Sequence, residues 1–292
     1  MQKQWIVGVF GLALIVGTAR AGWEYTAVTK GEGGKHTAMV NNQMHALIDG
    51  TKARMEFVES GNPMMVAGNY LVTEDAGKTV YMVNPTEKTY STWNMEAMLG
   101  LAGNMMSMMN MKVKDQQIEK LVEEKGERML GQPTTHYKFH TSYTVEMNFM
   151  GMQHSTPTSL DEEIWTTAAL TDAAAAFVPL RNSMKTGNAE LDKLIADQKS
   201  RMKGFPLKMI TTHHTTDPRG QARETTTTME VTNLKQISPS ASEFKLPSGY
   251  QAQETPVMPG LGGDAGKQGG GEKSNGENPF LKLLQQQLQK QQ

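Results

Sequence analysis

Cysteine is absent from the 292 residues, which excludes disulfide bonds, thiolate metal sites and cysteine nucleophiles. Without disulfides, the folded chain must be stabilised by its core. The formal net charge of -1 gives no electrostatic reason to expect a nucleic-acid partner. Leucine and isoleucine are sparse for a β core, whereas 23 methionines are present. The core is therefore expected to be unusually rich in thioethers.

Catalytic motifs are missing as well. The sequence has no G-x-S-x-G, no H-E-x-x-H and no phosphate-cradling glycine loop. Residues 31–34 are interpreted as a hairpin turn, and the glycines of residues 260–271 as part of a linker. We therefore expect neither an enzyme nor a bound cofactor.

Histidines and acidic residues do not form a recognisable metal motif. His136 and His140 share one face of a predicted strand, but four residues along a strand cover about 13 Å, too far to share a metal. His213 and His214 are expected on opposite faces. The acidic run 161–163 lacks the glycine-spaced oxygen ligands of a calcium loop and is interpreted as a solvated turn. No metal site is predicted.

Long hydrophobic runs are confined to residues 6–16. With Lys3 before this run and Ala19-Arg20-Ala21 after it, residues 1–21 have the pattern of a cleaved signal peptide. The run is shorter than the ~20 apolar residues of a membrane span. We expect export to the periplasm of a Gram-negative bacterium, and we do not expect an integral membrane protein.

Antiparallel strands dominate the rest of the chain. Residues 52–58 alternate apolar and polar side chains, as a half-buried strand does, and Asp49-Gly50 before them suits a type I′ turn. Residues 112–126 are interpreted as a long strand, with a helix over 117–125 as the alternative. Further strands are predicted at 43–48, 69–74, 79–83, 88–93, 136–143, 162–168, 207–216 and 222–237, which gives a meander of about nine to eleven strands.

A methionine-rich helix is predicted after Asn94, which can serve as its N-cap. Met95, Met98, Leu99, Ala102, Met105, Met106 and Met109 recur at helical spacing, and residues 97–111 carry no charge. A helix that is apolar nearly all round is normally buried or in contact with an apolar ligand. Two further helices are expected to begin at Asp172 and Asn188.

The last part of the chain changes in composition. Residues 22–255 can form one domain, whereas residues 256–278 are rich in glycine and charge and are predicted to be a disordered linker. Residues 279–292 are predicted to form a short glutamine-rich amphipathic helix that docks an envelope protein.

Several short motifs together resemble a known group. They are residues 49–56, 83–90, 131–137 and 244–250. The chain resembles an uncharacterised family of exported bacterial proteins that is similar to the LolA/LolB lipoprotein carriers. The resemblance implies an α+β fold, a strongly curved antiparallel sheet forming an incomplete β-barrel, with helices packed on its concave side. In the carriers, that cavity receives acyl chains.

The predicted function is a non-enzymatic periplasmic binding or carrier protein for a lipid, an acyl chain or another apolar ligand. Two alternatives are a methionine-rich copper-handling protein and a structural envelope protein whose cavity is filled by its own side chains. Met55, Phe57 and Tyr90 are expected on the inner face of the sheet. The predicted ligand-lining residues are Met55, Phe57, Tyr90, Trp93, Met95, Met98, Leu99, Met105, Met106 and Met109.

Overall fold

The structure is a computed structural model that describes residues 22–34, 37–62, 65–93, 112–149, 152–170, 192–193, 196–197, 200–216 and 221–253. Several predicted segments lie outside these residues. They are the signal peptide (1–21), the methionine-rich helix with Met95, Met98, Leu99, Met105, Met106 and Met109, the start of the helix at Asp172, the linker (256–278) and the C-terminal helix (279–292).

The described residues form one sheet of twelve strands, with two short 3-10 helices beside it. In chain order the elements are β1 (Gly22–Glu32), η1 (Thr37–Val40), β2 (Asn42–Asp49), β3 (Lys52–Ser60), β4 (Tyr70–Thr73), β5 (Val80–Asn84), β6 (Thr89–Trp93), β7 (Lys112–Lys125), β8 (Thr135–Phe149), β9 (Met152–Thr167), β10 (Phe205–Thr216), β11 (Ala222–Ile237), η2 (Ala241–Phe244) and β12 (Gln251–Gln253).

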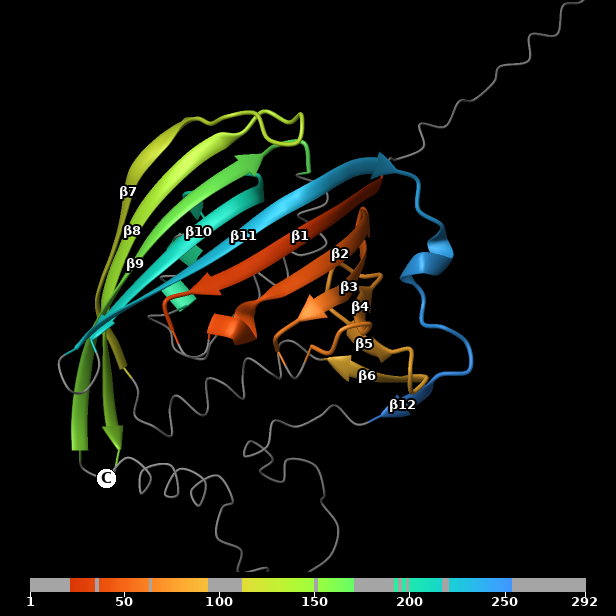
Figure 1. Ribbon diagram of the computed structural model, residues 1–292, viewed down its shortest axis with the longest axis horizontal. Coiled ribbons are helices and arrows are strands. Elements are labelled where there is room, and N and C mark those ends of the chain that lie inside the picture. Colours follow the sequence, from red (N-terminus) through yellow and green to blue (C-terminus); the bar gives the residue numbers. More distant parts are fainter. Residues whose placement is uncertain are drawn as a thin grey trace, which may run out of the picture.

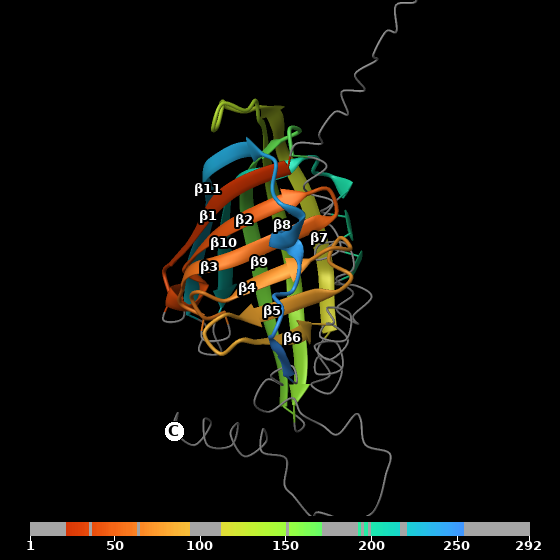
Figure 2. The same cartoon turned by 90° about the vertical axis from the view of Figure 1, so that its right-hand side faces the viewer.

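The strand order is β12-β6-β5-β4-β3-β2-β1-β11-β10-β9-β8-β7. Every pairing is antiparallel except that of β12 with β6. Two meanders, β1–β6 and β7–β11, are joined where β1 pairs with β11. Figure 1 shows the long strands β7–β11 arching over one side of the molecule, and Figure 2 shows β1–β6 standing in front of them. The sheet is therefore open but strongly curved.

The predicted α+β fold with helices on the concave side is wrong. The described residues are almost entirely β, they include no complete α-helix, and their named helical elements are the two 3-10 helices. Residues 152–161, which precede the strand predicted at 162–168, extend β9 because threonine and serine side chains are compatible with a paired strand and threonine favours one. β8 and β9 are each about twice as long as predicted, so this part of the sheet is larger than expected.

Other local expectations had mixed outcomes. The long strand at residues 112–126 is confirmed as β7, and the alternative helix over 117–125 is wrong. The acidic run 161–163 lies inside β9, so the solvated turn is also wrong. Asp49 pairs with Lys52, and only Gly50 of the loop has positive φ (60°). The loop is thus Gly50-Thr51, with glycine where a type II′ turn requires it, not the predicted type I′ turn.

The concave face holds most of the core. Residues from β1, β2, β3, β10 and β11 form its largest apolar cluster, in which Tyr25 and Phe205 pack edge to face with ring centroids 5.4 Å apart. A second cluster lies on β3, β5 and β6, and a third on β8 and β9. Alternate residues of each strand point to this face, so the register of the sheet selects the core.

A smaller cluster lies on the opposite, convex face. Phe244 of η2 is buried there against Tyr70, Val72 and Val83. Ser240 caps η2 by accepting a hydrogen bond from the Ser242 backbone N–H. Within the described ranges, no helix is long and apolar enough to cross a membrane.

Phe244→Ala should remove the anchor that holds residues 238–253 against the convex face. Loss of this fully buried ring should lower the free energy of unfolding by about 3–5 kcal/mol, measured by urea denaturation. Met39→Ala is the matched control because that side chain is 47% exposed, and its effect should stay below about 0.5 kcal/mol. Equal effects of the two substitutions would contradict this account of η2.

Candidate functional site

The concave face carries three of the predicted ligand-lining residues. Met55 packs against the largest apolar cluster, and Phe57 and Trp93 belong to the cluster on β3, β5 and β6. Tyr90 was expected with them but lies on the convex face, where it packs near Phe244. Tyr90 and Trp93 are three residues apart in β6, and the alternation of a strand places such residues on opposite faces.

Methionines of the strands contribute to this face in a way that the sequence analysis missed. Met44 and Met229 pack against the same cluster as Met55, Met82 is buried beside Trp93, and Met209 packs beside Ile164. Each occupies an inward-facing position of its strand, so the period of two was the signal that could have identified them. The concave face thus combines aromatic rings with flexible thioethers.

A carboxyl group and an imidazole lie among the apolar side chains of this face. Glu162 of β9 is buried and pairs in register with Phe139 and Thr211, and His213 of β10 lies on the same face. Burial lowers the pKa of His213, with a smaller contribution from the neighbouring His214. The ring of His213 therefore favours its neutral form.

The convex face of β8–β11 carries a chain of histidines and carboxylates. His140 Nδ1 lies 2.7 Å from Asp161 Oδ1, and His214 Nε2 lies 3.0 Å from Asp161 Oδ2. His214 Nδ1 is 3.3 Å from Glu224 Oε2. His214 is therefore held between two carboxylates, through both ring nitrogens. The expectation that His213 and His214 point to opposite faces is confirmed.

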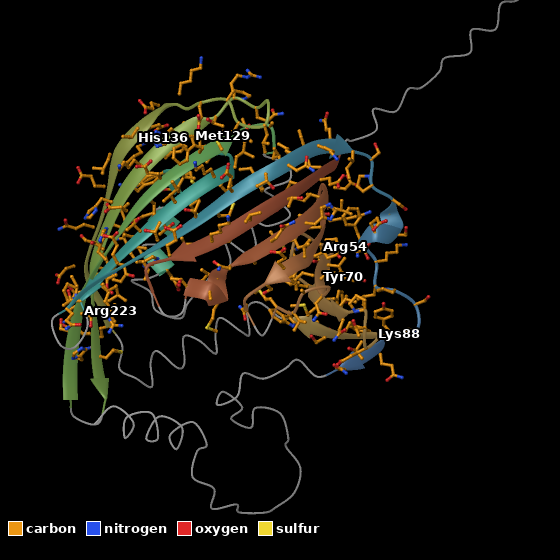
Figure 3. All side chains as sticks on the ribbon, viewed as in Figure 1. Arg54, Tyr70, Lys88, Met129, His136 and Arg223 are labelled. Atoms are coloured by element: carbon orange, nitrogen blue, oxygen red, sulfur yellow. The ribbon has the colours of Figure 1, made fainter. Side chains whose placement is uncertain are left out.

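A second polar group lies farther along the same face. His136 stacks on Trp165 with ring centroids 4.6 Å apart, and its Nδ1 lies 3.2 Å from Glu124 Oε1. Lys138 Nζ lies 2.7 Å from Glu163 Oε1. His136 is labelled on the outer side of the arch in Figure 3. His136 and His140 share a face, as predicted, but each has its own carboxylate.

Hydrogen bonding sets the pKa directions in these groups. The hydrogen bond with His140 is the largest effect and lowers the pKa of Asp161. Burial opposes it, and a smaller effect of the hydrogen bond with His214 lowers the pKa further. The ammonium of Lys138 likewise lowers the pKa of Glu163. Among the described side chains, no group of three or more histidines and carboxylates is placed to hold a metal ion. The geometry is that of charge-paired ladders across neighbouring strands.

Asp161→Asn should lower the free energy of unfolding at pH 7 by at most about 1 kcal/mol, because the carboxylate and both histidines are about 40% exposed and solvent screens them. The pKa of Asp161 is lowered in the folded chain, so its stabilisation is present above the unfolded pKa of about 3.9 and is lost as the pH falls through the folded value. In urea titrations, the difference from wild type should shrink from about pH 5 to pH 3.

Glu87→Gln alters an exposed carboxyl away from these histidines and should have a negligible effect over the same range. A difference for Asp161→Asn that grows between pH 5 and pH 3 would contradict the assigned direction of the pKa shift.

Comparison with known proteins shows to which family the chain belongs. A structure of PNGF-II aligns with 80% of this chain and 32% of that chain, at 12% identity and a TM-score of 0.31. The chain thus spans about a third of that neighbour, and a likeness of this size carries no argument. No curated protein matches the chain. The model of DUF4412, a domain of unknown function, matches residues 35–250, which confirms the prediction of an uncharacterised family. Because this match includes every strand from β2 to β11, the chain belongs to the DUF4412 family.

Proposed function

We propose that this protein is a non-enzymatic binding or carrier protein of the cell envelope whose ligand is a lipid, an acyl chain or another apolar molecule. One observation carries the proposal: apolar side chains line the concave face from β6 at one side of the curved sheet to β8 at the other. Such a lining suits an apolar ligand, which gains free energy in proportion to the apolar area removed from water.

The composition of the lining supports a ligand of variable shape. Five inward-facing methionines, Met44, Met55, Met82, Met209 and Met229, belong to or pack against its clusters. Thioether side chains have several rotatable bonds and are polarizable, so they adapt to differently shaped partners. Aromatic rings at Trp23, Tyr25 and Trp93 add rigid apolar area. Such a surface can accept acyl chains without selecting one length.

The envelope location rests on the signal-peptide pattern of residues 1–21. The fold expected from the resemblance to the LolA/LolB carriers was wrong. The resemblance is therefore used here only as a proposal about ligand class. The copper alternative depends on residues 95–111, which lie outside the described part of the chain, and no observation on the described residues favours it. The structural alternative, a concave face filled by the protein's own side chains, is tested below.

Leu71→Gln should weaken the binding of a fluorescent fatty-acid probe to the delipidated full chain by about tenfold or more, measured by titration. Leu71 packs in the concave cluster beside Trp93, and a buried amide without a partner there would disfavour an acyl chain. The matched control is Leu47→Gln, which changes an equally half-buried leucine on the convex face. It should lower stability similarly but leave probe affinity unchanged.

Wild-type protein that binds no probe after delipidation would support the self-filled structural alternative and overturn the carrier proposal. Equal loss of binding in both variants, with equal loss of stability, would show that the probe reports folding and not a site on the concave face.

A further inference from the structure

A cavity of about 560 Å³ lies over the middle of β7–β9 and the adjoining ends of β10 and β11. Its wall includes Arg223, which Figure 3 places where β7–β11 converge, at the opposite end of these strands from His136. This volume lies in the range of small-molecule sites. Ser142, Ser159 and His214 in its lining continue the convex face that carries His140 and Asp161. Other lining residues alternate onto the opposite face of their strands, namely Tyr143, Thr158, Thr215 and Arg223.

The base of the cavity is a single lateral row across five strands. Gln117 of β7 pairs with Ser142 of β8, Ser142 with Ser159 of β9, Ser159 with His214 of β10, and His214 with Glu224 of β11. All five residues line the cavity. Neighbouring strands lie about 4.8 Å apart, so the row offers an amide, two hydroxyls and a carboxylate to a ligand, while the His214 ring is already bound to Asp161 and Glu224.

The row is held in place at both ends. His214 is fixed between Asp161 and Glu224, at 3.0 and 3.3 Å. At the other end, the ladder of β7 and β8 shifts register between Lys114 and Gln117, and Asp115 in this bulge has a positive φ of 55° and lines the cavity. Bulges of this kind re-aim side chains and are common beside binding sites. A positive φ at a residue other than glycine carries strain of the sort found at functional sites.

The chemistry of the wall selects a class of ligand. Serine and threonine hydroxyls and the Gln117 amide can each donate and accept hydrogen bonds, as the hydroxyls of a sugar do. The charges are of both signs, with Asp115 and Glu224 opposing Arg223, so neither an anion nor a cation is strongly favoured. Pro157 adds apolar surface for the C–H face of a sugar ring. The strand spacing is comparable to the length of one such ring.

We propose that this cavity binds a neutral saccharide of about disaccharide size. The site lies on the face opposite the apolar lining, so it is independent of the proposed lipid-carrier function. Gln117, Ser142 and Ser159 donate to or accept from vicinal hydroxyls, Glu224 accepts from them, and His214 orients Glu224 without contacting the ligand. It requires no chemical step.

The test uses the full chain and three neutral disaccharides as probes: maltose, cellobiose and chitobiose. At least one should show saturation-transfer NMR signals and a measurable dissociation constant. Removing two hydroxyls in the double variant Ser142→Ala/Ser159→Ala should weaken that probe about tenfold. Ser155→Ala is the matched control, since Ser155 lies on the same strand and face as Ser159 but outside the cavity, and it should bind as wild type does.

Three results would overturn the proposal. They are the binding of no disaccharide, equal weakening by Ser155→Ala, and binding of inorganic phosphate in place of the disaccharides, which would mark an anion site. A fluorescent fatty acid should not compete with the disaccharide, because the two ligands occupy opposite faces. The saccharide site can therefore fail or hold whatever the outcome for the apolar ligand.

Discussion

The pairing of β1 with β11 is the constraint on which the rest of the structure depends. It joins two meanders that each have only local connections, and it matches Gly22 with Ile237 and Glu32 with Thr226. Such distant pairing carries a loop-closure entropy that local hairpins avoid, so the ladder must be long enough to offset it. Because β1 lies between β2 and β11, Tyr25 and Ala27 contribute to a core shared by both halves.

The register of this ladder also separates the two proposed functions. A strand alternates its side chains between faces, so a shift by one residue would exchange the apolar and polar sets of a whole strand. In β10, Met209 faces the concave core while Lys208 lies over the ring of Trp165 on the convex face. The apolar lining and the hydroxyl row therefore arise from one arrangement of hydrogen bonds. Neither could be altered by a register change without altering the other.

What the sequence predicted is limited to single strands and their turns. The alternation from Lys52 onward predicted β3 and the inward positions of Met55 and Phe57, and the strand at residues 112–126 is β7. Contacts between side chains on neighbouring strands could not be predicted, because the contact of Asp161 with His140 and His214 depends on the register of three strands. The misplacement of Tyr90 has a different origin: the spacing of Tyr90 and Trp93 already contradicted a shared face. The full length of β9 could not be predicted, because its first half is rich in serine and threonine, which also occur in loops.

An open sheet leaves two edges, and unpaired edges recruit further strands into aggregates. Here the bulges of β7 bear on that hazard. Its ladder with β8 shifts register twice, after Lys114 and after Lys120, and charged side chains such as Glu119 and Lys125 lie along it. An added strand would meet an irregular backbone flanked by charged side chains there. At the other edge, β12 spans only Gln251–Gln253. Both edges of the described sheet are therefore too irregular or too short to serve as a template for strand addition.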